Sequence, residues 1–232
     1  MSFLFGSGGP RFRDRRDAGR QLAARLDHLA AEDVVVLGLP RGGVEVAYEV
    51  ATALDAPLDV VVARKLGAPQ QPELAIGAIA PGASVLRHDV IEMLGISDDE
   101  IRRITAREEA RAEELERRLR HGRPALDLTG RTVIVVDDGL ATGATATAAA
   151  RSVRGRGPAR VVLAVPVAAP ESAEDLAAEV DEVITVMRPP DFHAVGLWYG
   201  SFPQVTDDEV EAMLDERAAA RGAHGQPAGP KR

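Results

Sequence analysis

Residues 133–145 read VIVVDDGLATGAT, and this stretch decides the fold that the sequence predicts. Its four β-branched apolar residues predict a buried strand, because parallel strands covered on both faces are almost continuously apolar. Two carboxylates, Asp137 and Asp138, follow the strand directly, and small residues and threonines come next. Such a loop at the start of a helix can present successive backbone N–H groups to an anion. The stretch therefore predicts a strand, an acid pair and a phosphate cradle.

Outward from this stretch, buried strands and helices alternate along the chain. This alternation predicts an α/β fold, a doubly wound and mainly parallel five-stranded sheet with helices on both faces. The predicted strands are 34–39, 58–65, 132–137, 160–166 and 182–187, and the helices are 42–54, 143–154 and 171–180.

The other segments are more varied. Apolar spacing predicts a first helix over 17–31, and 206–220 is predicted to be helical. Two prolines and the lack of an apolar period predict a mobile loop over 66–75, with short strands in IGAIA (76–80) and ASVLR (83–87).

A long charged helix is predicted over 98–120, with Ser97 as its cap and Glu100 placed for a capping box. We interpret its charges as a solvated face with intrahelical ion pairs, and an oligomer contact is the alternative.

The composition excludes several classes of protein. The 232 residues contain no cysteine, which excludes disulfides and thiolate sites and favours the cytoplasm. No apolar run is long enough to span a bilayer, so a membrane role is not expected. A formal charge of −8 argues against a broad nucleic-acid surface, although a local basic pocket for a small polyanion stays open.

Three unusual loops follow predicted strands: PRGG (40–43), RKLGAPQQPE (64–73) and the acid loop. Ligands of open parallel sheets bind outside the carboxyl ends of the strands, so we expect the three loops to converge there. Taken alone, PRGG is equally well an ordinary strand-to-helix turn, and plain surface charges are the alternative interpretation of Arg64 and Lys65.

The acid loop resembles the ribose-5-phosphate signature of type I phosphoribosyltransferases: a hydrophobic strand, two acids and then A-T-G-x-T. The resemblance covers about residues 33–200. It implies that Asp137 and Asp138 hold the ribose 2′ and 3′ hydroxyls of phosphoribosyl pyrophosphate (PRPP). The loop that would wrap the 5-phosphate consists of Ala141, Thr142, Gly143, Ala144 and Thr145.

The two other loops agree with this resemblance. PRGG is similar to the family's diphosphate loop, which contains a cis peptide, here expected at Pro40–Arg41, and Gly42 and Gly43 would bind PRPP. Arg64 and Lys65 resemble the pair that contacts pyrophosphate in several members, and 66–80 takes the place of the flexible catalytic loop. The resemblance thus implies that the catalytic residues are Arg41, Arg64, Lys65 and Asp138.

The acceptor site is expected in a hood over 188–204. Family members often stack an aromatic residue on the base, and the candidates here are Phe192, Trp198 and Tyr199. The same stretch is equally well a half-buried strand, and His193 has no spacing partner that would make it a general base. VPVAAP (165–170) lacks the lysine with which family members recognise 6-oxopurines, so the acceptor is not assigned.

The predicted function is transfer of 5-phosphoribose from PRPP to a nitrogenous base or related acceptor, with release of pyrophosphate. The resemblance implies Mg²⁺ held mainly by PRPP, with Asp137 and Asp138 as indirect ligands. A regulatory module that senses PRPP or a nucleotide is the alternative, and a receiver-like phosphoacceptor at Asp137 is a third. The predicted partners are PRPP and a small-molecule acceptor, and a homodimer stays open.

The predicted organisation is a single domain over 12–220. It includes a charged insertion over 88–122 and the hood, and the segments 1–11 and 221–232 are expected to be flexible tails.

Overall fold

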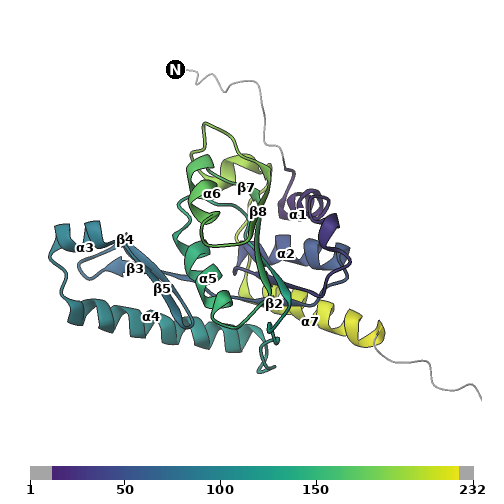
Figure 1. The fold of residues 1–232 in the computed structure, drawn as a ribbon, viewed down its shortest axis with the longest axis horizontal. Coiled ribbons are helices and arrows are strands. Elements are labelled where there is room, and N and C mark those ends of the chain that lie inside the picture. The colour runs from purple at the N-terminus through teal and green to yellow at the C-terminus, as the bar shows by residue number, and fades with distance from the viewer. Residues whose placement is uncertain (1–11, 225–232) are drawn as a thin grey trace, which may run out of the picture.

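Five parallel strands form the central sheet of the protein, which we describe from a computed structural model covering residues 12–224 (Figure 1). The order across the sheet is β2-β1-β6-β7-β8, and every neighbouring pair is parallel. This arrangement confirms the predicted fold class. The strands are β1 Val34–Gly38, β2 Leu58–Val60, β6 Thr132–Val136, β7 Arg160–Val167 and β8 Glu182–Met187.

Helices cover both faces of this sheet, because alternate residues of its strands point to opposite sides. Val34 and Val36 pack with α1 Arg15–Ala23, α2 Gly42–Ala53 and α7 Asp207–His224 on one face. Val35 and Leu37 pack with α5 Ala144–Arg154 and α6 Pro170–Leu176 on the other face. The near-continuous apolar strands are thus explained by a core on each side of the sheet.

A second, antiparallel sheet of three strands lies in a lobe beside the first (Figure 1). Its strands are β3 Arg64–Ala68, β4 Gln71–Ala80 and β5 Ala83–Leu86, and the helices of the lobe are α3 His88–Leu94 and α4 Asp98–Leu119. The hairpin and the helices share a small apolar core that includes Leu66, Ile76, Ile79 and Ile104.

The prediction of a loop over 66–75 was wrong, since most of this stretch belongs to β3 and β4, and its mobility stays a prediction. The pairing between the two strands is irregular after Leu66, where Gly67 faces Ala75 and Ala68 faces Gln71. Pro72 falls within this irregular stretch, where a bulge tolerates the missing N–H. The single strand predicted over 58–65 was wrong as well, because Leu58–Val60 alone pairs with β1 and Arg64 begins β3.

Helix α4 has the predicted capping box, in which Ser97 and Glu100 bond reciprocally. The expected solvated face covers only part of α4, because another side of the helix packs on the hairpin and on α7. Its buried residues are Ile104, Glu108, Ala112 and Leu119.

The ends of several helices differ from the prediction. The first predicted helix is divided into α1 and a 3-10 turn, η1 Asp27–Leu29, although the apolar positions that predicted it are buried. Helix α6 ends at Leu176, and α7 continues to His224, past its predicted end at 220 and into the segment that was expected to be a tail. The segments 1–11 and 225–232 lie outside the described residues, and no helix among residues 12–224 is long and apolar enough to cross a membrane.

Candidate functional site

Asp137 and Asp138 lie at the carboxyl end of β6, the central strand of the parallel sheet. The N–H of Asp138 donates to Oδ1 of Asp137 at 2.8 Å, which turns the first carboxylate back onto the loop. Burial raises the pKa of Asp137 well above its ordinary value, and the neighbouring charge of Asp138 raises it further. Burial also raises the pKa of Asp138, against the opposing effect of Arg15. Ionising both carboxylates is therefore costly here unless a cationic partner lies close to them.

Arg15, at the start of α1, is that partner. Its Nε donates to Oδ2 of Asp138 at 2.8 Å, and its Nη1 donates to the carbonyl of Pro203 at 2.7 Å. The guanidinium also lies 3.7 Å from the centre of the Phe202 ring, and the side chain is only 6% exposed. Sequence analysis missed this residue, because nothing distinguishes it from the other arginines in RFRDRRDAGR (11–20).

The PRGG loop lies directly against the acid pair. The peptide bond Pro40–Arg41 is cis, as the resemblance implied. A Cβ atom at Gly43 would lie 2.8 Å from Cα of Asp137, and one at Gly42 would collide with the carboxylate of Asp138. Both positions therefore need glycine for the PRGG loop and the acid loop to meet.

The loop 141–145 begins α5, as predicted. Gly143 is the residue before the helix and has a φ of 76°, which favours glycine. The first turn of a helix leaves backbone N–H groups without helical partners, so this loop directs N–H groups to the same sheet edge as the acids. The hydroxyl of Ser172 donates to the carbonyl of Ala141 and links the loop to α6.

The predicted cations come from different elements. Nε of Arg41 donates to Asp207 at 2.8 Å, at the start of α7, and Nε of Arg64 donates to Glu108 at 2.8 Å, on α4. Arg15, Arg41 and Arg64 line one cavity of about 340 Å³. Lys65 is exposed and does not line this cavity, so the structure brings together Arg41 and Arg64 but not Lys65.

The predicted hood contains a 3-10 turn, η2 Val195–Trp198, rather than the half-buried strand that was its alternative. The hydroxyl of Tyr199 donates to the backbone carbonyl of Asp138. Its ring, 5% exposed, packs against Phe12 and Phe202 at centroid distances of 5.4 and 4.9 Å. These contacts give Tyr199 a role in holding the hood against the acid loop, while base binding by Phe192, Trp198 and Tyr199 stays a prediction.

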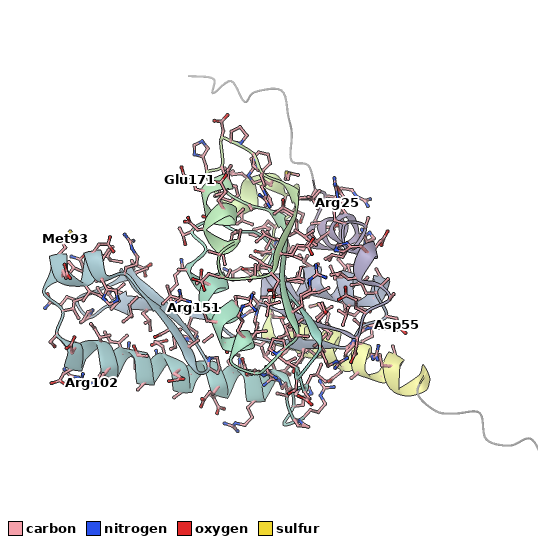
Figure 2. The ribbon with its side chains drawn as sticks, viewed as in Figure 1. Arg25, Asp55, Met93, Arg102, Arg151 and Glu171 are labelled. Carbon is pink, nitrogen blue, oxygen red and sulfur yellow. The ribbon has the colours of Figure 1, made fainter. Side chains whose placement is uncertain are left out.

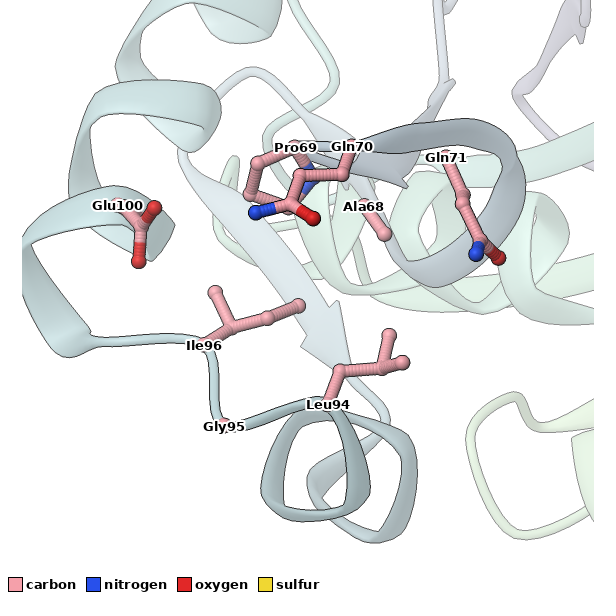
Figure 3. Close-up of a pocket in the computed structure, with 8 residues that line it drawn as sticks. All are labelled: Ala68, Pro69, Gln70, Gln71, Leu94, Gly95, Ile96 and Glu100. Atoms are coloured by element: carbon pink, nitrogen blue, oxygen red, sulfur yellow. The ribbon is translucent and has the colours of Figure 1, made fainter.

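A separate small cavity of about 120 Å³ lies at the tip of the hairpin and is shown in Figure 3. It lies between the β3–β4 turn and the α3–α4 turn and is lined by Pro69, Gln70, Leu94 and Ile96, among others. None of the predicted site residues lines it, so it is not part of the site around the acids.

Comparison with known proteins agrees with this geometry. The family model described as "Phosphoribosyl transferase domain" matches residues 13–196, which is most of the chain. The chain belongs to the phosphoribosyltransferase family. This match confirms the family resemblance of the acid loop.

Two relatives extend the comparison. A Mycobacterium tuberculosis protein (strain H37Rv) named "Putative phosphoribosyl transferase Rv0571c" is 49% identical over 205 residues, 88% of this chain and 46% of that protein. This phosphoribosyltransferase chain therefore spans about half the length of the curated relatives that it matches. The crystal structure of TT1426 from Thermus thermophilus is 48% identical, with a TM-score of 0.75, and the match covers 89% of this chain and 98% of that one.

Proposed function

We propose that the protein binds PRPP and transfers its 5-phosphoribosyl group to a nitrogenous base or related acceptor, with release of pyrophosphate. The observation that supports this most strongly is the meeting of two loops at one sheet edge. The cis Pro40–Arg41 peptide and its two glycines lie against Asp137 and Asp138, directly before a glycine-led helix N-terminus. Membership of the family supports the same reaction.

In this proposal the acid pair and the loop bind opposite ends of one sugar phosphate. Asp137 and Asp138 accept hydrogen bonds from the ribose hydroxyls, and the ionised carboxylate is the form in which both oxygens act only as acceptors. The N–H groups of 141–145 bind the 5-phosphate. Arg15 stabilises the ionised form of Asp138 from the side of α1.

Cationic side chains would stabilise the negative charge of the departing diphosphate. Arg41 and Arg64 line the cavity beside the acid loop, and each is oriented by a carboxylate partner. Negative charge accumulates on the diphosphate as its bond to C1 breaks, so preorganised guanidinium groups lower the barrier. Lys65 stays a catalytic candidate that would have to act from the exposed side of β3.

The implied Mg²⁺ has few protein ligands available. Among the described residues no group of three or more acidic, histidine or cysteine side chains could hold a metal ion. Asp137 and Asp138 alone fit an ion that keeps its waters and is held chiefly by ligand phosphates, which is the usual binding mode of Mg²⁺. Such an ion would neutralise charge on the diphosphate.

The sensor alternative differs from the enzyme in what it needs. Catalysis would need closure of 66–80 to exclude water, and because this stretch is a paired hairpin, β3 and β4 would have to close as a unit. A binding module would need only the phosphate loop and the acids.

Titration with PRPP and Mg²⁺, followed by a panel of bases scored for pyrophosphate, tests the proposal. Pyrophosphate release with one acceptor supports the enzyme, whereas PRPP binding without turnover for any acceptor supports the sensor. Failure to bind PRPP would overturn both. The homodimer and the cytoplasmic location stay predictions, and light scattering coupled to gel filtration measures the first.

A further inference from the structure

Helix α4 carries a row of arginines on the side that borders the β3–β4 hairpin. Arg103, Arg107 and Arg111 recur every four residues and therefore share one face of the helix. With Arg64 and Lys65 they line a groove of about 560 Å³ between α4 and the hairpin. This volume is within the range of small-molecule sites.

The groove is strongly cationic in a protein of net negative charge. Five cationic side chains line it, against the two carboxylates of Glu100 and Glu108, while the whole chain has a formal charge of −8. A cleft lined by one sign of charge raises the local concentration of ligands of the opposite sign. The excess is therefore a local property of this groove and not a reflection of composition.

Glu108 organises the arginines without neutralising them. Its carboxylate accepts hydrogen bonds from three arginines: Arg64 at 2.8 Å, Arg107 at 3.0 Å and Arg111 at 2.8 Å. The Glu108 side chain is only 7% exposed. The side chains of Arg107 and Arg111 remain 59% and 58% exposed. Because each guanidinium has five N–H donors, most of their hydrogen-bonding capacity stays open to a ligand.

The groove also offers apolar surface. Pro69, Pro72 and Ile104 line it beside the cations. A site that combines guanidinium groups with apolar side chains suits a ligand with a phosphate at one end and a ring at the other.

A neighbouring groove of about 620 Å³ shares Arg64, Arg107 and Arg111 with the first and continues to Arg118 and Arg41. The row from Arg103 to Arg118 covers about 22 Å at the helical rise per residue. Arg103, Ile104 and the two prolines line the first groove but not the second, so the first groove continues beyond the part of α4 that Arg41 faces and has room for another ligand.

We propose that the groove between α4 and the β3–β4 hairpin is a second ligand site, which binds a phosphate ester of nucleotide size next to PRPP. The phosphate binds Arg107 and Arg111, and the organic part packs on Pro69, Pro72 and Ile104. The ligand is either the acceptor itself or an effector, since both sources share this chemistry. The inference relies on the proposed function only for the identity of the neighbouring ligand.

The test is calorimetric titration of the protein with AMP, GMP and UMP, and with inorganic phosphate, in the presence of saturating PRPP. If PRPP does not bind, the same titrations are made without it. The groove variant is Arg107→Gln/Arg111→Gln, and both side chains are exposed enough for the fold to tolerate the change. The matched control is Arg102→Gln/Arg117→Gln, which removes the same charge from the outer side of α4, where Figure 2 labels Arg102.

We expect at least one nucleotide to bind, with an affinity that falls about tenfold or more in the groove variant and is unchanged in the control. Equal losses in both variants, or no binding of any nucleotide to the wild-type protein, would overturn the second site. Nucleotide binding that depends on Arg107 and Arg111 without any PRPP binding would support the groove and overturn the proposed function. A bound nucleotide that is consumed with release of pyrophosphate is the acceptor, and one that is not consumed is an effector.

Discussion

Asp137 and Asp138 are adjacent carboxylates whose burial disfavours the charge on each of them. The sequence showed that they are adjacent and follow a strand. The structure adds that Arg15 pairs with one of them and that Gly42 and Gly43 leave space for both. The chemistry of the pair therefore depends on residues from three separate parts of the chain.

Asp138→Asn should weaken PRPP binding by about ten- to hundredfold. A hydrogen bond to a charged group contributes about 1.5–3 kcal/mol, and asparagine lacks the charge while it keeps an oxygen for Arg15. Calorimetric titration measures the change, and circular dichroism checks that the fold is intact. An unchanged dissociation constant would remove Asp138 from the ribose site.

Gly43→Ala should reduce both stability and PRPP binding. The added Cβ would lie 2.8 Å from Cα of Asp137, so the PRGG loop or the acid loop must move, at a cost of about 1–3 kcal/mol. Gly155→Ala is the matched control, because Gly155 has a φ of −61° and a Cβ there would meet no atom closer than 3.4 Å. Urea unfolding compares the two, and equal stability would contradict the tight packing of the loops.

The contribution of Asp137 to stability should fall as pH rises above 3.8, the ordinary pKa of an aspartate. The reason is that folding raises the pKa of Asp137. The folded state then holds the proton more tightly than the unfolded state, and this contribution is lost as the carboxyl ionises. In Asp137→Asn, thermal stability relative to the wild-type protein should therefore increase with pH across this window.

Asp181→Asn is the control with the opposite sign. A hydrogen bond from the N–H of Val161 lowers the pKa of Asp181, so this carboxylate contributes stability that is present above its ordinary pKa and lost in acid. The variant should lose stability relative to the wild-type protein as pH rises. The same trend in both variants would contradict the raised pKa of Asp137.

At the scale of elements, α4 is held to β2 by a buried ionic network. Arg120 donates to Asp59 at 2.7 Å and to Glu116 at 3.0 Å, and Glu116 accepts from the N–H of Val62 at 2.9 Å. Val62 lies between β2 and β3, where the chain leaves the main sheet. The network therefore fixes the point at which the lobe joins the core.

Arg120→Ala should destabilise the protein by about 3–5 kcal/mol, because it leaves the buried carboxylate of Asp59 without its charged partner. Arg117→Ala on the same helix should cost only about 0–1 kcal/mol, since its ion pair with Glu114 is exposed. Chemical unfolding of both variants measures the difference. Similar losses would show that the network contributes no more than a surface pair.

On the scale of the whole molecule, the residues of the two proposed sites are distributed between the parallel sheet and the lobe. The sheet edge carries the acid and phosphate loops, and the lobe carries Arg64 and the arginines of α4 (Figure 1). The cavity lined by Arg15, Arg41 and Arg64 lies where the two parts meet.

PRPP should raise the melting temperature by roughly 5–10 °C at a concentration about a hundredfold above its dissociation constant. Binding to the native state alone then adds about 2.7 kcal/mol, and a chain of this size gains about 2–4 °C per kcal/mol. Thermal scans with and without PRPP measure the shift, and ribose 5-phosphate serves as the comparison that lacks the diphosphate. No shift at any PRPP concentration would count against the proposed function.

Local patterns were enough to predict the parallel sheet, most of its helices and the capping box of α4, whereas the cis peptide was implied by the family resemblance. In each case the residues that determine the feature are neighbours in the chain, as Ser97 and Glu100 are. The strand pairing within 64–75 was missed, because Pro69 and Pro72 look like loop residues, and only the structure shows that Pro69 lies in the turn and Pro72 in an irregular stretch of the pairing. Tyr199 of the expected hood segment donates to the backbone of the acid loop, while the hood itself and its base-binding role stay predictions.

By itself the sequence determined the alternation of strands and helices and the order of acids, glycines and threonines after β6, because these depend on short-range patterns of side-chain size and polarity. Only the tertiary structure decided that Arg15 pairs with Asp138, 123 residues away, and that Arg64 pairs with Glu108, 44 residues away. Many arginines in this chain are alike in sequence, and the physical difference between them is burial next to a carboxylate, which exists only once the chain is folded.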